Sequence, residues 1–387
     1  MSSLIRALPP TDPIDNASEA SPLDASGPLT IEGLTKLLTW GLKRDLSDLI
    51  LTPEQPPWYR RHGVFLPAGR RSITAAETNR LLIDMSLSEA AAAIVASGQD
   101  LDFSFEIGPR GDKKRFRCNA TAISLGRSTG VTLALRAIPG RPPALAELNL
   151  EPGLLEALFP MDGLVLVTGV MGSGKSTLLA AALRSLAETG GRHITTFEAP
   201  VEFDLTDPNG LKGPVEQTEI PNHLPFFHLA PRNAARRAAD VVLLGETRDR
   251  ETLGSLIEAA GMGVTAYATA HTRGVAETPT RLINLFEPKE RPVMAAELLS
   301  VTKLIVQQRL LPQKGGGRLA VREYLSLNAP TRQELQKLPL NELEGALGAL
   351  LESQGQTLLK SALTAFKQGL LTLETVAPLA REKGVKI

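Results

Sequence analysis

The residues with the clearest chemical potential stand together at positions 169–177, in the stretch GVMGSGKST. An apolar run, LVLV at 164–167, precedes it, and LLAAAL follows at 178–183. This order predicts a buried strand, a glycine-rich turn and a helix. Such a turn exposes backbone N–H groups to an anion, and the helix adds the positive end of its dipole. The stretch therefore predicts a nucleoside-triphosphate site formed by Gly169, Gly172, Ser173, Gly174, Lys175, Ser176 and Thr177.

Two side chains of this stretch have separate expected roles. Lys175 can reach the β- and γ-phosphates, and Ser176 can place its hydroxyl on Mg²⁺. The alternative is a glycine-rich connection in an ordinary α/β protein. A chance match to GxxxxGK[ST] in a chain of this length has a probability on the order of one in a hundred. We therefore expect ATP and Mg²⁺ as cofactors.

Two glutamates and a histidine follow further apolar runs. Glu198 lies in ITTFEAPVEF, Glu246 in DVVLLGETRD and His271 in ATAHT. In open α/β sheets, ligands bind at the carboxyl ends of the strands. We expect Glu198 to activate water and Glu246 to hold a Mg²⁺-bound water, although the two roles can be exchanged. His271 can sense the γ-phosphate.

Each of these three residues also has an ordinary structural interpretation. A carboxylate after a strand often caps a helix, and a single histidine is often a satisfied polar residue. Their common position downstream of the glycine-rich turn favours function. Arg248 follows Glu246, and we expect it to pair with Asp249 or Glu251.

Composition limits the class of protein. A chain of 387 residues is too long for one ordinary core, so two or three domains are expected. Lys plus Arg and Asp plus Glu both number 42, so overall charge gives no attraction to nucleic acid, and no direct nucleic-acid contact is expected. The single cysteine, Cys118, excludes an internal disulfide. Without a long apolar run or a signal-peptide pattern, we expect a cytoplasmic protein with at most peripheral membrane contact.

The pattern along the chain predicts an α/β fold in several parts. Proline, serine and aspartate in residues 1–28 predict a disordered tail, and residues 29–138 an α+β domain. The segment 139–150 begins PGRPP and predicts a linker. Residues 151–332 alternate apolar strands with helices, and residues 333–387 are helical in pattern. The strands predicted for this core are 164–168, 193–197, 240–244 and 264–269.

These motifs together resemble the secretion-ATPase superfamily, which drives type II secretion, type IV pilus extension and retraction, and type IV secretion. GVMGSGKST resembles its Walker A motif, FEAPVE its Asp box, VVLLGETRD its atypical Walker B and ATAHT its His box. SDLILTPEQPPWYRRHG, LDFSFEI and RFRCNA resemble its N-terminal PAS-like domain. VQQRLLPQ at 306–313 resembles a stretch that follows the His box.

The resemblance implies a RecA-like P-loop core, a PAS-like N-terminal domain and a helical C-terminal region. It also implies a homo-hexamer that works with inner-membrane and cytoplasmic components of a secretion or conjugation machine. The family uses arginines from its N-terminal domain, so Arg115, Arg117 and Arg136 are candidates to reach the γ-phosphate. The alternative is that these arginines only solvate an edge of a small sheet.

One departure from the family pattern narrows the resemblance. Most members have Glu-Asp-Pro where this chain has Glu198-Ala199-Pro200. In lacking this aspartate, the chain resembles the branch of the family that serves type IVB (Dot/Icm-like) secretion and plasmid conjugation. A type IV pilus or type II secretion motor is the alternative within the family. A RecA-like nucleic-acid translocase and a non-hydrolysing ATP-binding scaffold are alternatives of other classes.

Overall fold

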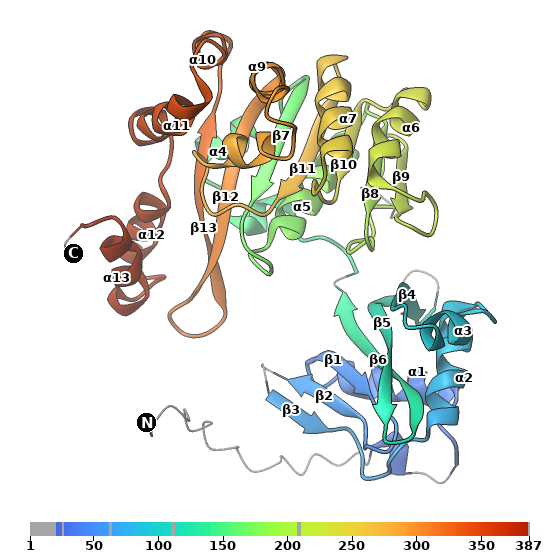
Figure 1. Ribbon diagram of the computed structural model, residues 1–387. Coiled ribbons are helices and arrows are strands. Elements are labelled where there is room, and N and C mark those ends of the chain that lie inside the picture. The colour runs from blue at the N-terminus through green and yellow to red at the C-terminus, as the bar shows by residue number, and fades with distance from the viewer. Residues whose placement is uncertain are drawn as a thin grey trace. The chain divides into compact units, whose positions relative to one another are not determined.

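The computed structural model describes residues 21–24, 27–61, 64–109, 113–138, 140–206 and 210–385. They divide into two compact units, one ending at Ile138 and the other following it (Figure 1). Most of the predicted tail, residues 1–20 and 25–26, lies outside the described residues. The 3-10 turn η1 (Pro22–Asp24) lies within the predicted tail, and its Leu23 packs into the core of the first unit.

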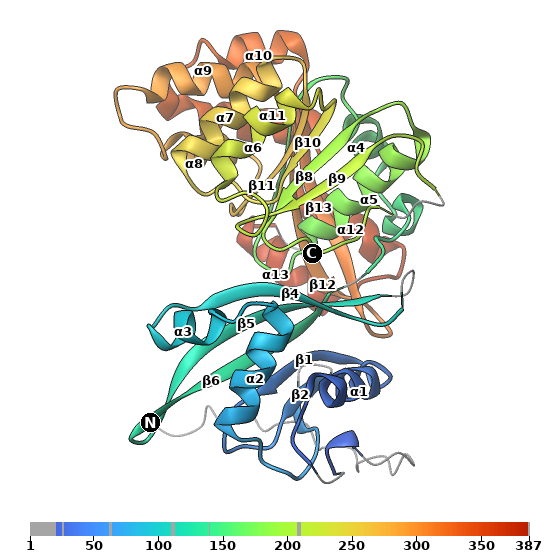
Figure 2. The ribbon, with the colours of Figure 1, turned by 90° about the vertical axis from the view of Figure 1, so that its right-hand side faces the viewer.

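The first unit is a six-stranded antiparallel sheet with helices on one face (Figure 2). Alternation along its strands explains this packing: Phe116 and Cys118 are buried under the helices, while Arg115 and Arg117 belong to the other face. The strand order is β3-β2-β1-β6-β5-β4. The elements are α1 (Ile31–Leu42), β1 (Leu46–Leu51), β2 (Trp58–Arg61), β3 (Val64–Pro67), α2 (Ala75–Ser86), α3 (Ala91–Ala96), β4 (Leu101–Ile107), β5 (Lys114–Leu125) and β6 (Ser128–Ile138).

The second unit is a seven-stranded mixed sheet with the order β13-β12-β7-β11-β10-β8-β9. The strands from β12 to β9 run parallel, and β13 pairs antiparallel with β12. The sheet strands are β7 (Gly163–Thr168), β8 (Ile194–Glu198), β9 (Val215–Glu219), β10 (Val241–Leu244), β11 (Thr265–Ala270), β12 (Thr302–Pro312) and β13 (Arg318–Ser326).

Helices cover both faces of this second sheet. Val165 and Val167 of β7 pack on the side of α5, while Leu164 and Leu166 face the cluster of α7 and α9. Burial on both faces explains why the central strands are continuous apolar runs. The helices and 3-10 turns are η2 (Leu145–Leu148), α4 (Pro152–Ala157), α5 (Lys175–Thr189), η3 (Phe227–Leu229), α6 (Ala230–Arg236), α7 (Arg250–Gly261), α8 (Thr278–Ile283), α9 (Arg291–Val301), α10 (Ala329–Leu335), α11 (Leu340–Gln354), α12 (Leu358–Lys367) and α13 (Leu373–Glu382).

The four core strands predicted from the sequence form within one residue of the expected bounds. Three others, β9, β12 and β13, have no counterpart among the predictions. The strand β12 is mostly apolar, but the polar run Gln307-Gln308-Arg309 interrupts the apolar pattern by which a strand is recognised in a sequence. In the structure both glutamines are buried. Among the described residues, no helix is long and apolar enough to cross a membrane.

The segment predicted as a linker is attached to the second unit. The carbonyl of Gly140 accepts from the backbone N–H of Asp204 at 2.8 Å. The carbonyl of Pro142 accepts from the Arg184 guanidinium at 2.6 Å. The described part of the segment therefore belongs to the second unit from Gly140 onwards.

Candidate nucleotide site

The phosphate loop, residues 169–177, follows β7 and includes the start of α5 at Lys175, in the order of strand, turn and helix that the sequence predicts. Gly169, Gly172 and Gly174 have φ angles of 139°, 75° and 87°, which side chains rarely tolerate. Two of them also face close contacts. A Cβ on Gly169 would lie 2.5 Å from the Gln308 carbonyl oxygen, and one on Gly174 would lie 2.6 Å from Gln308 Nε2. Backbone conformation and packing therefore both require glycine here.

Lys175 begins α5 and is 8% exposed. Its Nζ donates to the carbonyl oxygens of Gly169 at 2.8 Å and Val170 at 3.2 Å. Burial lowers the pKa of Lys175, and the nearby carboxylates of Glu246 and Glu202 oppose that shift. The ammonium group thus sits against the loop, where helix N-terminal N–H groups also favour an anion.

The strand order places the three other predicted residues beside this loop. From β7 the sheet continues to β11, β10 and β8, all parallel. Glu198 ends β8, Glu246 follows β10 by two residues, and His271 directly follows β11. A Cβ on Gly245 would lie 3.2 Å from Glu198 Cα, so the ends of β8 and β10 are in close contact. The structure therefore gathers these side chains at one edge of the sheet.

Glu198 is half-buried, and it lines a cavity together with Ser176 of the phosphate loop. Its Oε1 accepts from Thr196 Oγ1 at 2.7 Å and from Gln217 Nε2 at 3.3 Å. Burial raises the pKa of Glu198 to about 7, although the two hydrogen bonds lower it. Glu198 and Ser176 line one cavity of about 30 Å³, which is large enough for a water molecule.

Glu246 is held by two other groups of the site. His271 Nε2 lies 2.9 Å from Glu246 Oε1, and Arg248 forms an ion pair with the same oxygen. The expected pairing of Arg248 with Asp249 or Glu251 is therefore wrong. Asp249 is the N-cap of α7, where its Oδ1 accepts from Thr252 N at 2.7 Å. The capping bond occupies Asp249 and leaves Arg248 free to turn towards Glu246.

Two contacts of this site could not be read from the sequence motifs. Thr196 lies inside β8, and Gln217 lies in β9, a strand that was not predicted. Gln217 Nε2 also donates to the Phe203 carbonyl at 2.9 Å, and its Oε1 accepts from Leu205 N at 2.8 Å. The amide is therefore fixed on three sides. The alternation VEQTE was the only available signal for this strand.

The candidate arginines belong to the first unit and share one charged face of its sheet. Arg117 and Arg136 are directly paired between β5 and β6, and Arg115 lies two residues from Arg117. Their delivery to a γ-phosphate stays a prediction. The ion pairs are Arg115–Glu106 at 2.9 Å, Arg117–Asp102 at 3.8 Å and Arg136–Asp48 at 2.9 Å.

Comparison with known proteins identifies the family of this chain. Residues 59–377 match the family described as "Type II/IV secretion system protein". A twitching motility protein of Neisseria gonorrhoeae is 32% identical over 82% of this chain and 82% of its own length. The crystal structure of the Legionella pneumophila ATPase DotB is 34% identical, with a TM-score of 0.80 over 93% of this chain and 98% of that chain.

A second similar solved structure contains a bound nucleotide. The pilus retraction motor PilT with bound ADP is 30% identical, with a TM-score of 0.77 over 89% of this chain and 95% of that chain. Its fold has the same antiparallel N-terminal sheet and mixed parallel sheet. This chain belongs to the type II/IV secretion ATPase family and is an ATP-hydrolysing enzyme of the secretion and pilus motors.

Proposed function

We propose that this chain is the ATPase motor of a type IVB (Dot/Icm-like) secretion or conjugation system. The similarity to DotB over nearly the whole length of both chains carries this proposal. Ala199, where most members of the family have aspartate, supports it. A pilus retraction motor is the second candidate, because the similarity to PilT has nearly the same extent.

We infer that the site uses Mg²⁺ with ATP. The loop amides and Lys175 would hold the β- and γ-phosphates of a bound nucleotide. Ser176 and Glu246 supply oxygen donors, the hydroxyl directly and the carboxylate through a water, and oxygen is the ligand atom that Mg²⁺ prefers. The bound ion would neutralise charge that develops on the phosphates. The cavity shared by Ser176 and Glu198 is large enough for a water molecule.

Within this arrangement the two glutamates have different tasks. Glu198 orients or deprotonates the attacking water, since its buried carboxyl faces the small cavity and has a pKa near neutral pH. His271, whose Nε2 lies 2.9 Å from Glu246 Oε1, brings the end of β11 close to that carboxylate and senses the γ-phosphate. Thr196 and Gln217 fix the direction of the Glu198 carboxyl.

The remaining parts of the proposal concern assembly. The second unit is a RecA-like core and the first a PAS-like domain, as the motif resemblance implies. The chain forms a homo-hexamer, and an arginine among Arg115, Arg117 and Arg136 reaches a γ-phosphate. Its place is the cytoplasmic face of an inner membrane, beside components of the secretion machine. Family membership supports each of these statements.

Lys175→Ala is the variant that tests nucleotide chemistry. Loss of the ammonium removes the charge nearest the phosphates, so ATP turnover should fall to background while circular dichroism stays unchanged. Thr177→Ser, which keeps a hydroxyl in the same loop, is the matched control and should retain turnover. Wild-type turnover by Lys175→Ala would contradict the assignment of the site.

A genetic experiment separates the two candidate machines. A strain that lacks the gene would receive the wild-type chain or Lys175→Ala, and both substrate transfer and pilus-dependent motility would be measured. We expect the wild-type chain alone to restore transfer to recipient cells and to leave motility unaffected. Restored motility without any effect on transfer would favour the pilus motor and refute the type IVB proposal.

A further inference from the structure

A buried chain of polar contacts begins at the phosphate loop and crosses the edge of the second sheet. Gln308, on β12, donates from Nε2 to the Ser173 carbonyl at 2.7 Å. Arg322, its direct neighbour on β13, donates from Nε to Gln308 Oε1 at 2.9 Å. Ser173, Gln308 and Arg322 are 2%, 3% and 3% exposed. The loop is thus bonded to two strands that carry none of the family's phosphate-cleaving motifs.

The two contacts of Gln308 allow a single orientation of its amide. The reversed amide would set oxygen against the Ser173 carbonyl and nitrogen against the Arg322 N–H. Both pairs would then be mismatched and buried, which costs more than an exposed mismatch. Arg322 therefore determines that Gln308 presents a donor to the phosphate loop. The close approach of Gly174 to Gln308 Nε2 leaves the amide little room to move.

Arg322 connects the same chain to two further segments. Its NH2 group donates to the Leu148 carbonyl at 3.0 Å, and its NH1 group lies 3.5 Å from Glu151 Oε2. Ser361 of α12 donates to Glu151 Oε1 at 2.9 Å and accepts from the Arg322 backbone N–H at 3.1 Å. The guanidinium therefore contacts Leu148, near the end of the predicted linker, and Glu151 just after it, while α12 joins the chain through Ser361, which contacts Glu151 and the Arg322 backbone.

Stability alone is a poor explanation for this buried arginine. Burial lowers the pKa of Arg322 and Glu151 opposes the shift, as expected for a charge taken out of water. Buried ion pairs of this kind often contribute no more stability than apolar residues of the same volume. A planar guanidinium with several fixed partners instead holds those partners in one defined geometry.

We propose that Gln308 and Arg322 are positioning residues for nucleotide binding, which hold the phosphate loop and link it to α12. They act through the Ser173 carbonyl and touch no nucleotide themselves. Nucleotide binding should therefore change the stability of α12, and loosening Gln308 should weaken nucleotide binding. The inference rests on nucleotide binding at the phosphate loop, which Lys175→Ala tests separately.

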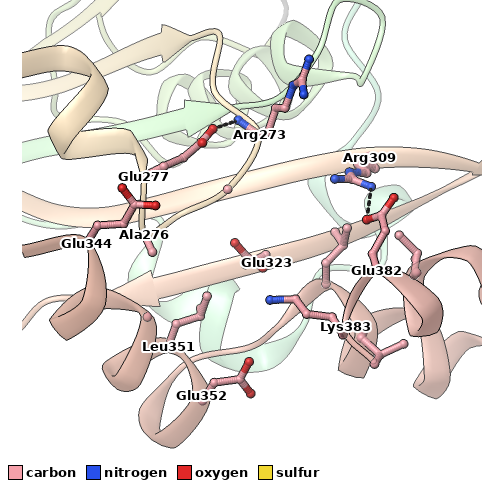
Figure 3. Close-up of a pocket in the computed structure, with 15 residues that line it drawn as sticks. Arg273, Ala276, Glu277, Arg309, Glu323, Glu344, Leu351, Glu352, Glu382 and Lys383 are labelled. Atoms are coloured by element: carbon pink, nitrogen blue, oxygen red, sulfur yellow. Dashed lines mark hydrogen bonds and ion pairs between the residues drawn. The ribbon is translucent and has the colours of Figure 1, made fainter. Parts of the chain in front are cut away.

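A neighbouring contact provides the control. Arg309, the next residue on β12, forms an ion pair with Glu382 of α13 at 3.4 Å, beside a cavity of about 260 Å³ (Figure 3). Its side chain is 30% exposed and that of Glu382 is 61% exposed. Like Gln308, Arg309 joins β12 to another element. Its ion pair with Glu382, however, is exposed and does not include a residue of the phosphate loop. Such exposed pairs contribute little.

The first test measures ADP affinity on the full-length chain by titration calorimetry. Gln308→Met keeps the length and shape of the side chain and removes both hydrogen bonds. We expect its dissociation constant for ADP to rise about tenfold or more, since a buried carbonyl and a buried guanidinium each lose a partner. Arg309→Met should stay within about twofold of the wild type. Wild-type ADP affinity in folded Gln308→Met would overturn the proposal.

A milder variant covers the case in which Gln308→Met does not fold. Glu151→Gln leaves the size of the side chain unchanged at a partly exposed position and removes the charge opposite Arg322. It should weaken ADP binding severalfold without a large loss of melting temperature. If it binds ADP as the wild type does, Arg322 does not position the loop. Where both variants fold, their effects should be non-additive because they act through one guanidinium.

The second test measures hydrogen exchange of the full-length chain with and without saturating ADP. In the wild type, ADP should slow exchange both in the phosphate loop and in α12. In Gln308→Met, saturating ADP should still protect the loop, while α12 should no longer respond. The link would be refuted if ADP left hydrogen exchange in α12 of the wild type unchanged. It would also be refuted if ADP slowed exchange in α12 equally in Gln308→Met. Failure of the wild type to bind ADP would instead refute the proposed function.

Discussion

At the scale of single residues, two carboxylates of the site have different surroundings. Glu198 is half-buried, and its carboxyl accepts hydrogen bonds from the Thr196 hydroxyl and the Gln217 amide. Glu246 faces the side chains of His271 and Arg248. We infer from these different surroundings that the two acids have different tasks. Glu198, whose pKa burial raises to about 7, suits proton transfer, and Glu246 lies beside two basic side chains.

The acids can be tested by neutral replacements of the same shape. Glu198→Gln and Glu246→Gln should still bind nucleotide and should lose about 10²-fold or more of ATP turnover. Binding and turnover are measured on the same preparations. A structure with nucleotide, Mg²⁺ and an in-line water would then assign the roles. If both carboxylates lie far from the γ-phosphate in that structure, the assignment fails.

The raised pKa of Glu198 gives a signed pH dependence. If the carboxylate activates water, turnover should fall below about pH 7 as the group is protonated. Gln217→Met removes a hydrogen bond that lowers this pKa, so the acidic limb of kcat should move to higher pH. Glu216→Gln, one residue away and exposed to solvent, is the control and should leave the limb in place. An unshifted limb in Gln217→Met would exclude Glu198 as the titrating group.

The same shift has the opposite sign for stability. A carboxyl group whose folded-state pKa is raised from 4.5 to about 7 binds its proton more tightly in the folded chain. Its contribution to the free energy of unfolding is therefore full at acidic pH and is lost as the pH rises through about 7. Activity and stability should thus change in opposite directions across this window, as in other sites where function is gained at a cost in stability.

At the scale of elements, strand order and helix starts bring the site together. The carboxyl ends of β7, β11, β10 and β8 meet at one edge of the sheet. Behind them, α5 begins at Lys175 and α7 begins just after Asp249. The cap of α7 fixes the turn that carries Glu246 and Arg248. An element boundary therefore sets the position of a functional side chain.

Asp249→Ala tests the capping contribution. Loss of the N-cap hydrogen bonds to Thr252 should lower the free energy of unfolding by about 1 kcal/mol. ATP turnover should fall as well, because the turn carrying Glu246 becomes looser. Asp249→Asn retains a capping oxygen and should preserve most of both quantities. Denaturant unfolding and ATP hydrolysis provide the two measurements, and an Asp249→Ala chain as stable as the wild type would contradict this role.

At the scale of the whole molecule, the site residues and the candidate arginines belong to different units. In phosphoryl transfer an added arginine is worth about 10³–10⁵ in turnover. Within the described part of the first unit, Arg115 and Arg136 are each ion-paired with a carboxylate of their own sheet. An arginine side chain that moved to a phosphate would have to leave that carboxylate. The arginine would thus exchange a carboxylate partner for a phosphate partner.

Removal of residues 1–143 tests this dependence. The remaining core should bind nucleotide but lose nearly all turnover, and Arg136→Ala or Arg115→Ala in the full-length chain should lose turnover with binding preserved. Asp48→Asn, which frees Arg136 from its carboxylate, should not lower turnover if the arginine acts on phosphate. Undiminished turnover by the isolated core, at concentrations where it is monomeric, would refute the dependence between units.

The sequence by itself determined the phosphate loop, the strands before Glu198, Glu246 and His271, and therefore the family. These features are local: a strand, a turn and a helix start each depend on neighbouring residues. Only the tertiary structure decided which side chains contact one another, because contacts such as that of Gln308 with Ser173 join positions 135 residues apart. Arg248 turned to Glu246 for the same reason, since the competing cap of α7 had already occupied Asp249. Buried glutamines look polar in a sequence, and their strand becomes recognisable only when their hydrogen-bond partners are in place.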